Sequence, residues 1–183
     1  MSTVSAAWVL AALRVLAPSS PYAETFDATA EAIARQASAA PLFAGPDGAR
    51  KTAALLASVG WYESSLNPAA EGDCLDKRKA DGTCAPGGTP TSYCLLQVNR
   101  TNLAMLGTTR AELVGDVDAC VRAGLAMMRQ SLAICRALPL EERLSWYAGG
   151  GPSCATPSED AKRKSRHRMG KARWLFDHVK DAA

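Results

Sequence analysis

The sequence predicts a mostly α-helical single domain that is interrupted by one polar loop. Its 183 residues suffice for one domain with a sizeable core. In most segments, apolar residues recur three and four positions apart, which is the spacing of one helix face. Residues 71–90 break this pattern, because they are polar, rich in glycine and hold two of the six cysteines. We therefore expect a helical domain with an inserted loop.

Residues 1–21 have two interpretations. The apolar run from Val4 to Leu16 is followed by prolines and serines, as in a secretory leader. No positive charge precedes this run and Arg14 interrupts it, which speaks against a leader. The alternative is an accessory helix, whose apolar stripe would consist of Val4, Trp8, Ala11 and Val15. Either way, residues 22–183 form the domain proper.

The first helix of the domain is expected over residues 23–39, which are rich in the strong helix formers alanine and glutamate. Its stripe would consist of Phe26, Ala30, Ile33 and Ala37. Pro41 to Asp47 should form a turn, and a second helix follows it.

This second helix carries Glu63 on an apolar face. Val59 lies four residues earlier and Leu56 seven, so the three side chains share that face. Pro68 ends the helix, which puts the carboxyl near the negative end of the helix dipole. Apolar surroundings and this dipole both raise the expected pKa of Glu63, as a general acid requires. The alternative is a glutamate at a helix end that points into solvent.

Beyond the polar loop, residues 92–99 could form a strand or the entrance to a helix, because their periodicity fits neither clearly. Thr101 to Leu106 should start a short helix. Asp116 is a candidate N-cap for a long helix that forms the buried axis of the domain. The stripe of this long helix would consist of Val117, Val121, Gly124, Met128, Leu132 and Cys135.

Leu144 to Pro152 should end a further helix at a glycine-rich turn. Trp146 and Tyr147 could offer flat faces to a sugar ring there, or could belong to the core. The last helix is expected over Ser165 to Val179, with a docked stripe of Met169, Ala172, Phe176 and Val179.

The six cysteines favour three disulfides and an oxidising compartment over free thiols in a cytosolic protein. Fifteen pairings are possible. Cys120 with Cys135 is excluded if both lie on one helix, because fifteen residues of helix span about 22 Å. Cys74 with Cys84 would close the polar loop. With no Cys-x-x-Cys pair and only two histidines, the sequence favours neither a zinc site nor another metal or cofactor site.

The net charge of +3 conceals a basic C-terminal segment. No aromatic residue is interleaved with the basic run and no binding motif accompanies it, so we expect no nucleic-acid partner. Its charges are either solvated or attract an anionic polymer. No apolar run reaches the roughly 18 to 20 residues that cross a bilayer, so we expect no membrane span. The basic residues are Lys162, Arg163, Lys164, Arg166, Arg168, Lys171 and Arg173.

Residues 63–70 read Glu-Ser-Ser-Leu-Asn-Pro-Ala-Ala, and three further blocks follow at residues 92–97, 116–124 and 144–150. The first block matches the signature Glu-Ser-x-x-Asn-Pro-x-Ala of the lysozyme-like lytic transglycosylases, the catalytic domains of soluble lytic transglycosylases, and all four blocks resemble this family. Residues 92–97 are similar to the family's Gly-Leu-Met-Gln segment, with Cys94 in place of glycine.

The third block, residues 116–124, resembles the family's Asp-Pro-x-x-Asn-Ile-x-x-Gly helix start, with Cys120 in place of asparagine. Residues 144–150 resemble the Ala-Tyr-Asn-Ala-Gly block, with Tyr147 at the tyrosine, or Trp146 in a register one residue earlier. The four blocks keep the family's order. Cysteines at both substituted positions could form a bond between Cys94 and Cys120 that fixes the cleft.

The resemblance implies a lysozyme-like helical domain whose cleft holds a peptidoglycan glycan strand. Glu63 would protonate the oxygen between N-acetylmuramic acid and N-acetylglucosamine, then take a proton from the muramyl 6-hydroxyl as an anhydro ring closes. Such chemistry uses neither metal nor cofactor. By resemblance, Ser64 and Tyr147 would position Glu63 or the developing charge, and the sugar sites would include Gln97, Ser92, Asn99 and Trp146.

Two other functions compete with this one. A hydrolytic muramidase needs a second carboxylate, which Glu71, Asp73, Asp76 or Asp81 could supply. A glycan-binding component of a secretion machine or phage particle would bind the strand and hardly cut it. All three functions place the protein in the periplasm, outside the cell or in a phage particle.

Overall fold

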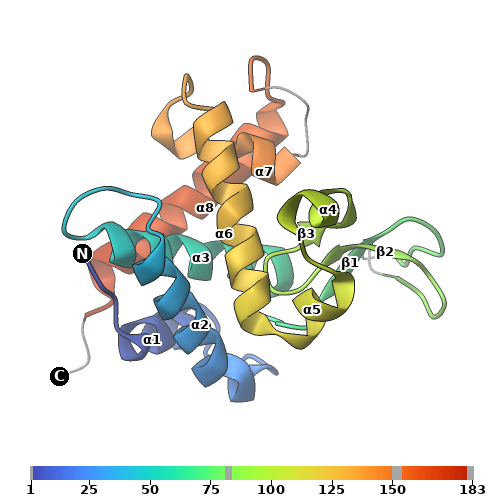
Figure 1. Ribbon diagram of the computed structural model, residues 1–183, viewed down its shortest axis with the longest axis horizontal. Coiled ribbons are helices and arrows are strands. Elements are labelled where there is room, and N and C mark those ends of the chain that lie inside the picture. Colours follow the sequence, from blue (N-terminus) through green and yellow to red (C-terminus); the bar gives the residue numbers. More distant parts are fainter. Residues whose placement is uncertain (1, 81–83, 150–153, 181–183) are drawn as a thin grey trace.

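The computed structural model describes residues 2–80, 84–149 and 154–180, and this part of the chain is mostly helical with one small sheet. Figure 1 shows the arrangement. The α-helices are α1 (Ala6–Leu16), α2 (Phe26–Ala39), α3 (Gly48–Ser64), α4 (Leu103–Leu106), α5 (Arg110–Gly115), α6 (Val117–Ile134), α7 (Ser145–Gly149) and α8 (Glu159–His178). Short 3-10 helices are η1 (Ala23–Thr25), η2 (Arg100–Asn102) and η3 (Leu140–Glu142).

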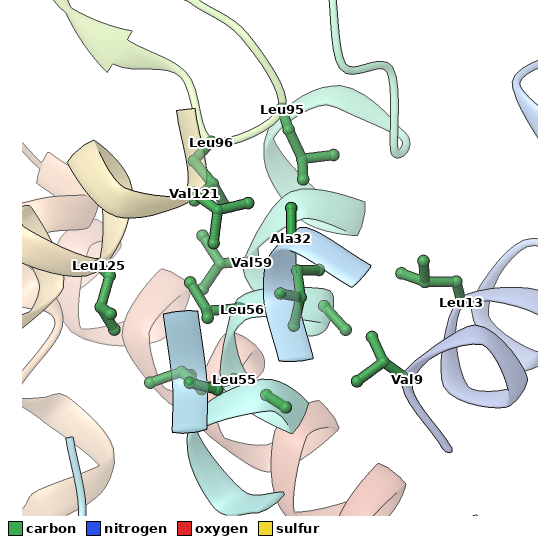
Figure 2. Packing of buried hydrophobic residues seen from close by; sticks show 14 of the residues in the cluster. Val9, Leu13, Ala32, Leu55, Leu56, Val59, Leu95, Leu96, Val121 and Leu125 are labelled. Atoms are coloured by element: carbon green, nitrogen blue, oxygen red, sulfur yellow. The ribbon is translucent and has the colours of Figure 1, made fainter. Parts of the chain in front are cut away.

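The core is built around α3, which is buried from Thr52 to Gly60. α3 packs against α2 on one side and α8 on another, and α2 also packs against α6. Figure 2 shows Leu56 and Val59 of α3 facing Val121 and Leu125 of α6, with Leu95 and Leu96 of the β2–β3 turn close by. The helix that carries Glu63 is therefore fixed from several directions.

The predicted helices over residues 23–39 and after Asp116 are confirmed. Phe26, Ala30, Ile33 and Ala37 are all buried. The Asp116 carboxylate caps α6 by accepting a hydrogen bond of 2.8 Å from the backbone N–H of Asp118.

Two helical predictions need correction. α8 begins at Glu159 instead of Ser165, because the Ser158 hydroxyl caps it by accepting from the Ala161 N–H. In α1, Val15 is 50% exposed, and the buried side chains are Trp8, Val9, Ala12, Leu13 and Leu16. Of the predicted stripe, Trp8 is buried and Val4 and Ala11 are partly buried against the core, so only Val15 is wrong, and Val9 and Leu13 add buried side chains that were not predicted.

The polar loop is more ordered than predicted, because it contributes two strands of a three-stranded antiparallel sheet. β1 (Glu71–Cys74) pairs with β2 (Pro90–Tyr93), which pairs with β3 (Val98–Asn99). Residues 92–99 are therefore strand, turn and strand rather than a helix entrance. In Figure 1, β1, β2 and the loop between them project from one side of the helical body.

All six cysteines pair, with Cα–Cα distances of 5.0, 6.0 and 5.0 Å for Cys74–Cys84, Cys94–Cys120 and Cys135–Cys154. The first pair closes the β1–β2 loop, and the second ties the β2–β3 turn to α6. Three disulfides are typical of a protein that folds in an oxidising compartment such as the periplasm or the extracellular space. Among the helices of the described residues, none is both long and apolar enough to cross a membrane.

Gly124 lets α6 approach the β2–β3 turn. A Cβ atom at this position would lie 2.2 Å from Leu96 Cδ1 and 2.8 Å from Leu96 Cβ, and both distances are too short for real atoms. The predicted interior role of Gly124 on α6 thus has a steric reason. Gly170 of α8 offers a contrast, because nothing lies within 4 Å of a Cβ built there.

We expect Gly124→Ala to lower the free energy of unfolding by about 1–3 kcal/mol, because Leu96 must move in a packed core. Urea denaturation followed by circular dichroism measures this. As the control, Gly170→Ala should leave stability unchanged or raise it by up to about 1 kcal/mol, since alanine restricts the unfolded chain. Equal stability of both variants would contradict the tight contact.

Candidate active site

A cleft of about 670 Å³ lies between the end of α3, the sheet, α6 and α7. Five of the seven predicted site residues line it, namely Glu63, Gln97, Asn99, Trp146 and Tyr147. Ser64 and Ser92 do not line the cleft. The Ser92 hydroxyl bonds to Gln97 and Asp73, which do line it, whereas the Ser64 hydroxyl bonds to the carbonyl oxygens of Gly60 and Leu95 behind it. The other lining residues are Asp73, Val98, Thr101, Asn102, Met127, Ala148 and Gly149.

The end of α3 aims Glu63 at this cleft. Ser65 and Leu66 have φ of 55° and 67°, so the chain turns sharply after Ser64. The Leu66 side chain is fully buried and its N–H donates to the Gly60 carbonyl. The Ser64 hydroxyl lies 3.0 Å from the Gly60 carbonyl oxygen and 2.8 Å from that of Leu95, which ties the helix end to the β2–β3 turn. Ser64 therefore positions the segment that holds Glu63.

Glu63 forms a shielded ion pair with Arg168 of α8. Arg168 Nη2 and Nε lie 2.6 and 3.1 Å from Glu63 Oε1. The side chains are 19% and 8% exposed, so neither charge is well solvated. Loss of solvation raises the pKa of Glu63, although the charge and hydrogen bonds of Arg168 oppose this, and the net direction is upward. The negative charge of Asp73 adds a smaller upward effect on the pKa.

Arg168 was not predicted as a site residue. The sequence shows it in a run of basic residues, which suggests a solvated surface. The signal that could have found it is its spacing, since Arg168 falls on the buried face of α8 with Ser165, Ala172 and Leu175. The Ser58 hydroxyl also donates to the Arg168 carbonyl oxygen at 2.8 Å, which anchors this turn of α8 against α3.

Tyr147 lies at the cleft wall near Glu63. Its hydroxyl donates to the Leu96 carbonyl oxygen at 2.5 Å, and its backbone N–H donates to the Ser131 hydroxyl at 3.1 Å. Burial raises the pKa of Tyr147 well above its ordinary value, and the charge of Glu63 raises it further. The tyrosine is therefore a neutral group that fixes the β2–β3 turn beside the carboxyl.

A network on the sheet presents Gln97 and Asp73 to the cleft. The Ser92 hydroxyl lies 2.8 Å from Gln97 Oε1 and 3.1 Å from Asp73 Oδ2. Gln97 Nε2 donates to the Cys94 carbonyl oxygen at 3.0 Å, which fixes the orientation of the amide. The Ser92 hydroxyl has one proton and can donate it to either Gln97 or Asp73. The other of these two oxygens is then open to an N–H or O–H group of a ligand.

The backbone around this network has unusual φ angles, and Gly72 makes room for the Gln97 side chain. Asp73, Cys94 and Gln97 have φ of 47°, 64° and 49°, a region that non-glycine residues rarely occupy. A Cβ atom at Gly72 would lie 2.2 Å from Gln97 Oε1. The Gln97 side chain thus occupies space that only glycine leaves free.

The remaining predicted residues have separate roles. Asn99 Oδ1 accepts from the N–H and the hydroxyl of Thr101, so Asn99 caps η2 at the cleft edge. Trp146 lines the cleft beside Tyr147, as an aromatic wall would. In the described residues, no group of three or more His, Cys, Asp or Glu side chains is arranged to hold a metal ion.

Comparisons of the chain with protein-family models, with curated proteins and with solved structures found no match. The site itself holds one shielded carboxyl with a raised pKa, a second carboxylate, an oriented amide and an aromatic wall around a cleft.

We expect Arg168→Met to raise the pKa of Glu63 further, because the variant removes the positive charge that favours the carboxylate. A ¹³C NMR titration of the Glu63 carboxyl carbon measures this pKa directly. Arg166→Met is the matched control, since Arg166 pairs with Glu142 on the surface. An unchanged pKa of Glu63 in Arg168→Met would contradict the opposing effect assigned to the arginine.

Proposed function

We propose that this protein is a lysozyme-like lytic transglycosylase that cleaves the glycan strand of peptidoglycan. The observation that carries the proposal is Glu63, a shielded carboxyl with a raised pKa that faces a cleft. A carboxyl that retains its proton nearer neutral pH can act as a general acid toward a glycosidic oxygen. The resemblance of residues 63–70 to the family signature supports the same role.

In the first step, Glu63 protonates the oxygen that links N-acetylmuramic acid to N-acetylglucosamine, and the bond from this oxygen to the anomeric carbon breaks. The carboxylate that forms is stabilised by Arg168, whose guanidinium already lies 2.6 Å away. In the second step, the carboxylate takes the proton of the muramyl 6-hydroxyl while this oxygen bonds to the anomeric carbon. Glu63 is then protonated again, and the product is a 1,6-anhydromuramyl end.

The cleft residues fit the binding of an amino sugar. Trp146 offers an apolar ring face for a sugar, and the Gln97 amide oxygen can accept from an N-acetyl N–H. Tyr147 acts through the β2–β3 turn that it holds, so it is a positioning residue, as is Ser64. The mostly helical fold with a small sheet beside the cleft also suits a lysozyme-like domain.

One observation favours the hydrolytic muramidase as the second candidate. Among the four carboxylates considered for this role, Asp73 lines the same cleft as Glu63. Glu71 pairs with Arg110, Asp76 accepts from Thr89, and Asp81 lies outside the described residues. Asp73 could hold a water or attack the sugar, as hydrolysis requires.

The third candidate is a component of a secretion machine or phage particle that binds glycan without cutting it. The same cleft would serve this function, and Glu63 would then be a binding residue. All three candidates bind peptidoglycan, which suits the oxidising compartment that the disulfides indicate.

We expect Glu63→Gln to lower the rate of release of soluble fragments from purified peptidoglycan by at least roughly a hundredfold, because the amide cannot donate the proton. Turbidity loss and fragment release measure this rate. Glu141→Gln, a substitution on η3 away from the cleft, is the control for general effects of removing a carboxylate. Equal release by the wild type and Glu63→Gln would exclude catalysis by this residue.

Asp73→Asn separates the two enzymatic candidates. For a lytic transglycosylase, mass spectrometry of the released muropeptides should give anhydro ends, lighter by one water than hydrolysed ends, from both the wild type and Asp73→Asn. A muramidase would instead give hydrolysed ends from the wild type. The yield of these ends would then fall by about a hundredfold in Asp73→Asn.

A further inference from the structure

Beside the candidate active site, aromatic and basic side chains of α3 and α8 form a continuous surface feature. We call it the aromatic–cationic strip, and it consists of Trp61, Tyr62, Lys171, Trp174 and His178. Tyr62 and Trp174 are 39% and 40% exposed. Large aromatic side chains exposed together are uncommon on a protein surface without a binding role.

The contacts along the strip hold Lys171 in place. Its ammonium lies 5.4 Å from the ring centroid of Trp61 and 5.0 Å from that of Trp174. The Trp174 ring also stacks on His178, with centroids 4.9 Å apart. Because residues 171 and 178 lie one helical turn before and one after Trp174, this ring is held between them. Such contacts orient the ammonium in advance, so less entropy is lost when it binds an anion.

Lys171 differs from its neighbours in having no carboxylate partner in the described part of the chain. The other six basic residues of the predicted segment each pair with an acidic residue, and Arg163 and Lys164 share Asp160. These pairs are Lys162–Glu159, Arg163–Asp160, Lys164–Asp160, Arg166–Glu142, Arg168–Glu63 and Arg173–Asp177. Lys171 is therefore the basic residue of this segment whose ammonium meets aromatic rings instead of a carboxylate in the described residues.

The strip reaches the candidate active site through Arg168. The guanidinium carbon of Arg168 lies 5.7 Å from the ring centroid of Tyr62, and the same guanidinium pairs with Glu63. Tyr62 in turn contacts Trp61 edge-on, with centroids 4.7 Å apart. The strip therefore begins at the residue next to Glu63 in α3 and shares Arg168 with it, although its own side chains lie outside the lining of the cleft.

We propose that the aromatic–cationic strip binds the stem peptide of peptidoglycan, with a peptide carboxylate on the Lys171 ammonium. This inference rests on the proposed function, because the muramyl residue at Glu63 is the sugar that bears the stem. An extended peptide advances about 3.3–3.6 Å per residue, so a few residues suffice to follow the strip. A sugar ring fits the strip less well than a peptide does, because Lys171 and His178 already contact the Trp174 ring on which a sugar would stack.

The test measures binding to purified sacculi that lack teichoic acid, so that peptide carboxylates are the anions present. Glu63→Gln serves as the background, because it separates binding from cleavage. One batch of sacculi keeps its stem peptides, and an amidase converts the other to glycan strands without stems, on which the anions are the lactyl carboxylates of muramic acid. The added substitutions are Lys171→Met, which removes the charge, Lys171→Arg, which keeps it, and the control Arg173→Ala at a position that is 86% exposed.

We expect Lys171→Met to weaken binding to stem-bearing sacculi by roughly three- to tenfold, with little change on the glycan strands that lack stems. Lys171→Arg and Arg173→Ala should bind as the background variant does. The proposal would be overturned if the background variant did not bind, or if Lys171→Met lost no affinity or lost it equally on both batches. The same loss of affinity in Arg173→Ala would also overturn it. If the wild type releases no fragments while Lys171→Met still shows the selective loss, the proposed catalysis fails and the strip remains a peptide site.

Discussion

The ion pair between Glu63 and Arg168 is the interaction on which the candidate site depends. It joins α3 to α8 across a sequence separation of 105 residues and places both charges where water has little access. Burial raises the pKa of the carboxyl and the guanidinium opposes this rise, with a net shift upward. The proposed role of Glu63, first as acid and then as base, calls for both influences, because burial favours the protonated form and Arg168 stabilises the carboxylate.

The β2–β3 turn holds the other side of this arrangement. The carbonyl oxygens of Leu95 and Leu96 accept hydrogen bonds from Ser64 and Tyr147, so the turn connects the helix that carries Glu63 to the wall of the cleft. The Cys94–Cys120 disulfide and the close approach of Gly124 tie the same turn to α6. Rigid elements thus position the groups around the carboxyl, which is the condition for precise general acid catalysis.

The basic residues of α8 fall into two groups with different consequences. Most of them pair with nearby carboxylates, so the helix does not present the broad positive surface that its sequence suggests. Arg168 and Lys171 differ, since Arg168 points inward to Glu63 and Lys171 lies between two indole rings. Sequence counts of charge cannot separate these groups, because the difference depends on which side of the helix meets α3.

The sequence by itself determined the features that depend on near neighbours in the chain. These are the apolar face that carries Glu63, the end of its helix before Pro68, the Asp116 cap and the disulfide between Cys74 and Cys84. Only the tertiary structure decided the pairing of Glu63 with Arg168 and the entry of Asp73 into the cleft. Helix spacing and caps act over three or four residues, whereas these contacts depend on how α8 and the sheet pack against α3. That packing is set by the whole core, so no short segment encodes it.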